Sequence, residues 1–338
     1  MELTTLCYIE QDGKYLMLHR ITKEKDINKD KWIGVGGHFE QGESPEDCLL
    51  REVREETGLE LLSYQFRGIL TFQLNERQAE YICLYTADKF TGELSACNEG
   101  TLEWVDKEEV LKMNLWEGDK IFFRLLKENA PFFSIKMHYE GDKMVYCQLN
   151  GKELELFDIL DEEGRATGKV RERSFVHQDG DLHGTAHVWI MREKENKKFD
   201  VLLQKRSSHK DTHPKCYDIS AAGHVAAGDN YLETAYRELK EELGICAGEG
   251  ELEYIGMCRS HTKGIVGEKK WVDNEISAVY IYCKNIGTDS FRLQKEEVED
   301  VRWIDYEECL KMIEEERINH CIQLREFLML KEWQEKQR

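Results

Sequence analysis

The chain has 338 residues, with 67 acidic against 47 basic side chains and a formal net charge of −20. The length suits two domains that each bury a core, and the acidity argues against sequence-independent binding to nucleic-acid polymers, which requires a basic surface. The eleven cysteines include no Cys-x-x-Cys pair. With no signal peptide and no apolar run of membrane-spanning length, we expect a cytoplasmic protein with reduced thiols and no membrane partner.

The first half opens with two predicted strands, residues 3–9 and 15–19, around the turn Gln11-Asp12-Gly13. A basic stretch, residues 20–31, and the glycine-rich loop Gly34-Val35-Gly36-Gly37 come next. This order predicts a hairpin whose second strand leads into a backbone loop.

An acidic helix follows the loop. Ser44 suits its N-cap with Pro45 in the first turn, and Gly58 suits a left-handed stop. A strand over residues 81–86, an acidic strand leading to Trp104 and further helices complete this part of the chain.

After Pro131, residues 132–149 are predicted to form a two-stranded hairpin that belongs to the first half. We therefore predict two domains, residues 1–150 and 151–338.

The second half repeats this order: two strands, a basic stretch, a loop and a capped helix, at residues 187–191, 201–204, 205–215, 220–223 and between Asn230 and Gly244. A polar turn, residues 192–198, separates the two strands. A strand over residues 278–283, an acidic strand leading to Trp303 and a closing helical segment, residues 319–336, follow.

Each helix carries three glutamates at i, i+3 and i+4, namely Glu52, Glu55 and Glu56 and then Glu238, Glu241 and Glu242. These project from one helix face, where like charges repel unless a hard cation such as Mg²⁺ or Mn²⁺ binds them. The alternative is a solvated acidic face with Arg51 and Arg54 as ion-pair partners. A glycine and an acid at matching upstream distances in both copies argue against it.

Both segments resemble the Nudix box, G-x5-E-x7-R-E-U-x-E-E-x-G-U, where U is aliphatic. The first matches from Gly37 through Glu43 to Leu59, and the second matches except that Asp229 replaces the first glutamate. The resemblance implies an α/β fold of two tandem Nudix α/β/α sandwich domains with mixed β-sheets. It also implies hydrolysis of nucleoside diphosphates linked to another moiety.

By position, the resemblance assigns metal binding to Gly37, Glu52, Glu55, Glu56, Gly223, Glu238, Glu241 and Glu242. Arg51 and Arg237 would orient the carboxylates without touching substrate. A carboxylate left off the metal can accept a proton from the attacking water. Family members also use a glutamate outside the box, for which Glu99 and Glu297 are candidates, with surface acids as the alternative. The catalytic candidates are thus Glu55, Glu56, Glu99, Glu241, Glu242 and Glu297.

The first domain is similar to MutT-type 8-oxo-dGTP diphosphatases in residues 31–37 and 115–119. The resemblance implies that Trp116 stacks on a purine and that Asp119 reads its edge, whereas a core aromatic is the alternative for Trp116. Animal members have asparagine where this chain has Ile33. The hypothesis is a purine nucleoside triphosphate, such as 8-oxo-dGTP, cut to monophosphate and pyrophosphate.

The second domain resembles the isopentenyl-diphosphate-isomerase-like branch in Glu155-Leu156-Phe157-Asp158, Trp189 and Ala222-Gly223-His224. True isomerases need a cysteine where Ala222 stands, and Cys216 lies too far upstream. Hydrolysis of an unidentified diphosphate is therefore favoured over isomerisation.

The roles of several basic and imidazole side chains are open. Arg20, Lys205 and Arg206 are candidate phosphate contacts, or solvated bases. A metal site, a phosphate site and a structural role are all open for His183, His187 and His224. One unit could also be a non-catalytic ligand-sensing or scaffolding domain, and the oligomeric state, including a homo-oligomer, is open.

Overall fold

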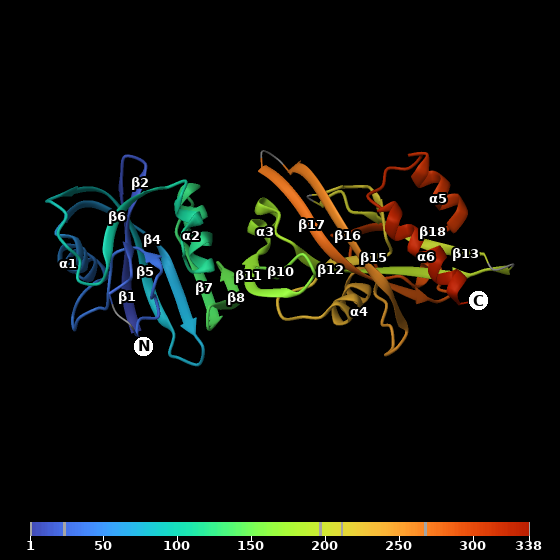
Figure 1. Cartoon of the computed structure of the whole chain (residues 1–338), viewed down its shortest axis with the longest axis horizontal. Helices are drawn as coiled ribbons and strands as arrows, with labels where there is room; N and C mark the ends of the chain where they lie inside the picture. Colours follow the sequence, from blue (N-terminus) through green and yellow to red (C-terminus); the bar gives the residue numbers. More distant parts are fainter. Residues whose placement is uncertain (1, 23–24, 196–197, 211, 267–268, 338) are drawn as a thin grey trace. The chain divides into compact units, whose positions relative to one another are not determined.

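The computed structural model describes residues 2–22, 25–195, 198–210, 212–266 and 269–337. The chain forms two compact units, Met1–Glu155 and Leu156–Arg338 (Figure 1). The short strand β9 (Lys152–Glu153) pairs with β8 (Lys143–Leu149), and this pairing holds the segment after residue 150 in the first unit. No helix among the described residues is both long and apolar enough to cross a membrane.

The first unit is built on one mixed nine-stranded sheet. Its other elements are β1 (Glu2–Gln11), β2 (Lys14–His19), β3 (Trp32–Ile33), α1 (Pro45–Thr57), β4 (Glu60–Leu74), β5 (Glu80–Thr91), β6 (Thr101–Asp106), η1 (Val110–Lys112), α2 (Glu117–Lys127) and β7 (Phe133–Glu140). β1 runs parallel to β5 and antiparallel to β2, and β4 runs parallel to β7. The strands predicted in this unit are confirmed, and those of the first hairpin extend beyond their predicted ends.

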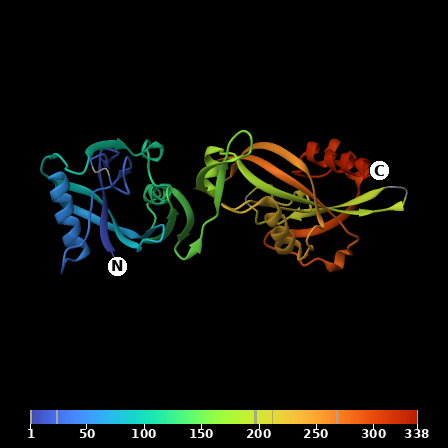
Figure 2. The same ribbon diagram turned by 60° about the horizontal axis from the view of Figure 1, so that its bottom comes forward.

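Helices cover both faces of this sheet (Figures 1 and 2). Val53 of α1 belongs to one buried cluster with Ile9 of β1. Phe123 of α2 contacts Tyr8, with ring centroids 4.7 Å apart. Because consecutive strand residues point to opposite faces, the two helices lie on opposite sides of β1.

The second unit repeats this plan with a mixed seven-stranded sheet and a separate hairpin. Its elements are β10 (Leu156–Leu160), β11 (Ala166–Glu172), α3 (Arg173–Asp179), β12 (His183–Glu193), β13 (Phe199–Arg206), β14 (Tyr217–Asp218), β15 (Ala221–His224), α4 (Tyr231–Leu243), β16 (Leu252–Val266), β17 (Lys269–Cys283), η3 (Thr288–Ser290), β18 (Val298–Asp305), α5 (Tyr306–Glu314) and α6 (Leu324–Lys336). β12 runs parallel to β17 and antiparallel to β13, as β1 does to β5 and β2.

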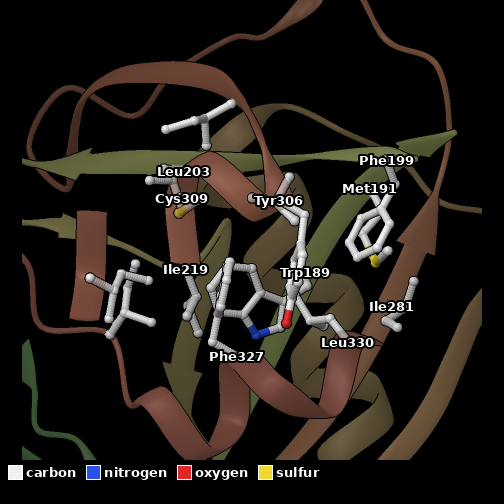
Figure 3. Packing of buried hydrophobic residues seen from close by; sticks show 14 of the residues in the cluster. Trp189, Met191, Phe199, Leu203, Ile219, Ile281, Tyr306, Cys309, Phe327 and Leu330 are labelled. Carbon is white, nitrogen blue, oxygen red and sulfur yellow. The ribbon is translucent and has the colours of Figure 1, made fainter. Parts of the chain in front are cut away.

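Alternate residues of β12 enter two different cores. Val188 packs in a cluster with Leu239 of α4. Trp189 contacts Phe327 of α6, with ring centroids 5.3 Å apart, and Phe327 stacks on Tyr306 at 4.7 Å (Figure 3). Both units therefore have helices on both faces of a mixed sheet, which confirms the predicted α/β/α fold.

Two predicted bounds in the second unit are wrong. The closing helix begins at Leu324, because the segment before it pairs with β14: Tyr217 N–H donates to Asn319 O at 2.8 Å and Cys321 N–H donates to Tyr217 O at 3.0 Å. The turn predicted at residues 192–198 is shorter, since β12 continues to Glu193 while β13 begins at Phe199. Residues 196–197 of that turn, and residues 23–24 and 211 of the basic stretches, lie outside the described chain.

Candidate active site

Helix α1 begins and ends where its capping residues predict. Ser44 Oγ accepts the Asp47 N–H at 3.1 Å, and Asp47 Oδ2 accepts the Ser44 N–H at 3.0 Å. Pro45 occupies the first turn, and Gly58 ends the helix with a φ of 75°. These contacts confirm the predicted helix ends and fix the direction in which Glu52 projects.

The loop before α1 is pinned to β1 and lies close to the helix. Thr5 N–H donates to Gly37 O at 2.9 Å. A Cβ at Gly36 would lie 2.0 Å from Thr5 O, and a Cβ at Gly37 would lie 2.5 Å from Glu52 Cδ. Glycine at both positions therefore allows the backbone to approach the strand and the carboxylate.

The three glutamates of α1 have different surroundings. Glu56 is 8% exposed and accepts the Gly36 N–H at 3.0 Å. The Glu52 side chain is 15% exposed, whereas that of Glu55 is 62% exposed. Burial, with the charges of Glu99 and Glu52, raises the pKa of Glu56 to about 7. A bound cation would favour the charged form of this crowded carboxylate.

Arg51 holds the surrounding acids in place. Its Nε and Nη2 donate to the two Glu43 carboxylate oxygens at 2.7 and 2.9 Å, and its Nη1 donates to Glu52 Oε1 at 2.6 Å. The hydrogen bonds from Arg51 lower the pKa of Glu43 to about 2. These are the ion pairs through which the resemblance expects Arg51 to orient the carboxylates, and its role in the reaction stays a prediction.

A cavity of about 360 Å³ opens beside α1 in the first unit. Its lining brings together most of the predicted site residues of this unit, namely Arg20, Gly37, Glu52, Glu56, Glu99, Trp116 and Asp119. Glu55 is not among the lining residues. The cavity therefore joins an acidic end to a wall that carries an aromatic ring and a buried carboxyl.

Arg20 is engaged by acids. Its Nε donates to Asp26 Oδ2 at 2.8 Å, and its Nη1 pairs with the Glu99 carboxylate. Arg20 thus positions Glu99 at the cavity, and the phosphate contact predicted for Arg20 would require one of these ion pairs to open.

Trp116 and Asp119 lie at the cavity wall with little exposure. Trp116 is 5% exposed, and Lys31 Nζ lies 4.2 Å from the centroid of its ring. The indole also makes a T-shaped contact with Tyr139, with ring centroids 4.7 Å apart. The predicted stacking on a purine would use the other indole face or displace Lys31. Burial raises the pKa of Asp119 to about 7.

Helix α4 repeats the arrangement in the second unit. Asn230 accepts the Glu233 N–H at 2.9 Å, and Gly244 ends the helix with a φ of 70°. Glu242 is 4% exposed, whereas the Glu241 side chain is 54% exposed. As in α1, one glutamate of α4 is therefore buried and another is exposed.

The loop before α4 also contacts its inward-facing acids. Ala222 N–H donates to Glu242 Oε2 at 3.2 Å, and Gln204 Nε2 donates to the same oxygen at 3.4 Å. A Cβ at Gly223 would lie 2.1 Å from Glu238 Cδ. Burial raises the pKa of Glu242, and the neighbouring Glu238 charge adds to this.

The replacement of glutamate by Asp229 loosens the second arginine. Arg237 Nη1 lies 2.8 Å from Glu238 Oε1, and Nη2 donates to His224 O at 3.3 Å. Within the described chain no ion pair joins Arg237 to Asp229. The Arg237 side chain is 39% exposed against 21% for Arg51. The shorter aspartate therefore leaves the second arginine with a weaker anchor.

Glu297 forms an ion pair with Lys210, which was not among the predicted site residues. The backbone oxygen of Glu297 accepts the Ser207 N–H at 2.9 Å. The charge of Lys210 also lowers the pKa of Glu242, against the larger effect of burial. Lys210 therefore lies near both the candidate base and the acidic helix.

The other basic candidates of this unit are also paired. Lys205 Nζ donates to Glu299 Oε1 at 2.7 Å, and Arg206 Nη1 donates to Asp218 Oδ2 at 3.0 Å. Cys216 is buried, and its carbonyl accepts the Arg206 N–H at 2.9 Å.

A cluster of imidazoles lies beside β12 and β15. His177, His183, His224 and Asp273 each offer one ligand atom, and these atoms lie within 4.8 Å of one another. The Nε2 atoms of the three histidines and Asp273 Oδ1 are buried without a hydrogen-bond partner among the described residues. Such a group is costly unless a bound ion satisfies it.

The protonation of two imidazoles in this cluster also suits a cation. His183 Nδ1 donates to Asp181 O at 2.9 Å, so Nε2 is the ring nitrogen that would bind an ion. Burial lowers the pKa of His177 to about 3 and that of His224 as well, so both are neutral near pH 7. Three imidazoles and a carboxylate form a donor set that suits Zn²⁺ or a similar transition metal.

His187 has a different partner and does not belong to this cluster. Its Nδ1 lies 2.8 Å from Glu326 Oε2, and Trp189 Nε1 donates to Glu326 Oε1 at 2.8 Å. Although burial opposes charge on the imidazole, the Glu326 carboxylate outweighs it and raises the pKa of His187 to about 9. Among the three predicted histidines, the structure therefore separates His187 from His183 and His224.

Comparison with known proteins gives matches in both halves of the chain. The NUDIX domain family model matches residues 2–126 and 181–324. The chain is 40% identical over 164 residues to Nudix hydrolase 3 of Arabidopsis thaliana, covering 48% of this chain and 21% of that protein. It is 38% identical over 162 residues to an uncharacterized Nudix hydrolase of Clostridium acetobutylicum, covering 48% and 75%.

A third relative is named for its substrate. The chain is 27% identical over 150 residues to the oxidized purine nucleoside triphosphate hydrolase of Danio rerio, covering 44% of this chain and 94% of that protein. The match to the Arabidopsis protein spans about a fifth of that relative's length.

Proposed function

The chain belongs to the Nudix hydrolase family, and on this premise we propose that it hydrolyses diphosphate linkages of nucleotide derivatives with a divalent metal. One observation carries the proposal: each unit holds two inward-facing carboxylates of an acidic helix against a glycine loop. Oxygen donors of this kind suit Mg²⁺ or Mn²⁺.

In the first unit, Glu52 and Glu56 would hold the metal beside the Gly37 backbone. When bound, the metal offsets charge on the non-bridging phosphate oxygens and makes bound water more acidic. Arg51 keeps Glu52 in place through their ion pair. Glu99 lines the same cavity and would accept the proton that the attacking water releases as its oxygen bonds to phosphorus.

For the substrate of the first unit we propose a purine nucleoside triphosphate, such as 8-oxo-dGTP, cut to the monophosphate and pyrophosphate. The cavity joins the acidic end to Trp116 and Asp119, and its volume of about 360 Å³ suits a small ligand. The Danio rerio relative, named for hydrolysis of such triphosphates, supports the same choice.

For the second unit we propose hydrolysis of a different diphosphate, aided by a transition metal at His177, His183, His224 and Asp273. The ligand atoms of this cluster, which are buried and have no hydrogen-bond partner among the described residues, support the metal. Isomerisation stays disfavoured because Ala222 has no thiol. A non-catalytic ligand-sensing role for this unit is the alternative, supported by the weaker anchor of Arg237.

We also propose a cytoplasmic location. All eleven cysteines are free thiols, which suits a reducing compartment.

The test compares the full chain with its Glu56→Gln and Glu242→Gln variants. Release of phosphate and pyrophosphate is measured with and without Mg²⁺ over nucleoside triphosphates, sugar nucleotides and prenyl diphosphates. Each substitution is expected to lower the activity of its own unit about 10³-fold, because it removes a charged ligand of the proposed metal.

Glu60→Gln serves as the control, since this glutamate is exposed at the start of β4. If one substitution abolishes all activity and the other has no effect, only one unit is catalytic. An absence of metal-dependent turnover across the whole panel would overturn the proposed function. Double-bond migration in isopentenyl diphosphate would instead establish an isomerase.

A further inference from the structure

One wall of the first unit's cavity carries an amide whose two ends are used differently. Asn28 lines this cavity together with Trp116 and Asp119. The Trp116 indole Nε1 donates a hydrogen bond to Asn28 Oδ1 at 2.9 Å. Because an indole N–H is only a donor, the atom facing it is the amide oxygen. The Nδ2 group makes no hydrogen bond to another described residue, so its N–H groups are available to a molecule in the cavity.

The backbone around Asn28 is held from both sides. Asn28 N–H donates to Asp26 Oδ1 at 2.9 Å, and the other Asp26 oxygen accepts Arg20 Nε at 2.8 Å. The carbonyl of Asn28 accepts the Lys31 N–H at 2.9 Å. The amide is thus positioned before a ligand binds, which reduces the entropy lost on recognition.

The carboxylate of Asp119 adds hydrogen-bond acceptors to the same cavity wall. Its N–H donates to the Trp116 carbonyl at 3.0 Å, so Asn28, Trp116 and Asp119 form one connected group. An amide donor and two carboxylate oxygens together complement the edge of a 6-oxopurine. That edge offers the O6 acceptor followed by N–H donors at N1 and at the 2-amino group.

We propose that Asn28 is a specificity-determining residue of the first unit, whose amide donates to the ring carbonyl of a 6-oxopurine nucleoside triphosphate. Adenine carries an amino group in place of that carbonyl, so two donors would face each other. This inference rests on the proposed function of the first unit and narrows its substrate class to triphosphates of guanine-like bases.

The test uses the full chain with Glu242→Gln, which silences the second unit, with and without Asn28→Asp. Aspartate keeps the shape of asparagine and still accepts from Trp116, but it replaces the free donors with an acceptor. We would measure kcat/KM with Mg²⁺ and binding by calorimetry without Mg²⁺, using GTP, ITP and ATP. ITP keeps the ring carbonyl but lacks the 2-amino group, which separates the contact of Asn28 from that of Asp119.

Asn28→Asp is expected to lower kcat/KM and affinity for GTP and ITP about tenfold relative to ATP, the effect of one lost hydrogen bond. An unchanged ratio of GTP to ATP would overturn the proposal and leave Asn28 as a support for Trp116. In that case Asn28→Leu, which removes the whole amide, would weaken all three triphosphates alike.

The two proposals fail in distinguishable ways. Selective binding of GTP and ITP that is lost in Asn28→Asp, without turnover in the parent, would overturn hydrolysis and support the role of Asn28. Absence of both binding and turnover for every purine triphosphate would overturn both.

Discussion

Burial divides the carboxylates of each acidic helix into two kinds. Glu56 and Glu242 are 8% and 4% exposed, while the side chains of Glu55 and Glu241 are 62% and 54% exposed. A helix turns about 100° per residue, so Glu56 lies roughly 40° from Glu52 on one side and Glu55 roughly 60° away on the other. Only Glu52 and Glu56 face the loop. For this reason two of the three glutamates of α1 line the cavity.

Asp119 is expected to make the stability of the first unit depend on pH. Burial raises the pKa of its carboxyl from 3.8 to about 7, a shift of about 3 pKa units or roughly 4 kcal/mol. Because the folded pKa is the higher one, this stabilisation is fully present below pH 4 and is lost as pH rises through 7. Asp119→Asn should therefore flatten the fall in unfolding free energy between about pH 4 and pH 7.

The measurement is denaturant unfolding of the metal-free full chain across this pH range, with the difference between parent and variant plotted against pH. Asp106→Asn is the matched control, because the Asp106 side chain is 62% exposed. A parent–variant difference that stays constant from pH 4 to pH 7 would contradict the predicted protonation of Asp119.

The sequence predicted residues that belong to a continuous motif and missed those that meet only in the fold. Glu52, Glu56 and Arg51 have the predicted neighbours, because helix periodicity fixes their relation. His177 and Asp273 were not predicted, since His177 lies in the last turn of a short helix and Asp273 lies on a distant strand. Their meeting depends on the packing of α3 against β17, which no local pattern contains.

At the scale of elements, each site is a loop and a helix joined at a glycine. Gly37 and Gly223 both lie outside the left-handed region, so alanine would fit their backbone. A Cβ at these positions would instead lie 2.5 Å from Glu52 Cδ and 2.1 Å from Glu238 Cδ. The glycines therefore provide space for a carboxylate.

Gly37→Ala and Gly223→Ala are each expected to weaken Mg²⁺ binding in their own unit about 10- to 100-fold, by displacing one ligand carboxylate. The measurement is the Mg²⁺ concentration that gives half-maximal hydrolysis, together with the unfolding temperature. Gly287→Ala is the control, since a Cβ there meets nothing within 4 Å. An unchanged Mg²⁺ requirement in both variants would show that the glycines have only a folding role.

Helix ends were more predictable than strand ends and the closing segment. Ser44, Asn230 and the two glycine stops act locally, so their residues identify the ends directly. The closing helix was predicted too early because residues 319–322 have a helix-compatible composition. Their backbone pairs with Tyr217, a partner far away in the sequence.

At the scale of the whole molecule, the two units share a topology but offer different donors. The first presents carboxylates and a cavity with an amide and a carboxyl on its wall. The second unit has an acidic helix and also three imidazoles, which come from α3, β12 and β15. Because oxygen donors favour Mg²⁺ and imidazoles favour transition metals, the proposed functions would give one chain two classes of metal site. We therefore expect the two classes to be separable by metal removal.

The full chain loaded with Zn²⁺ and dialysed is expected to retain about one equivalent, because imidazole ligands bind zinc tightly while Mg²⁺ sites exchange readily. Elemental analysis should show that His183→Ala loses this ion and that His261→Ala, an exposed histidine of β16, keeps it. Chelation should lower the unfolding temperature of the second unit by on the order of 10 °C, and Zn²⁺ but not Mg²⁺ should restore it. Equal zinc content in parent and His183→Ala would mean that the buried imidazoles hold no metal. The cost of their unpaired nitrogens would then have to be met by water within the cluster.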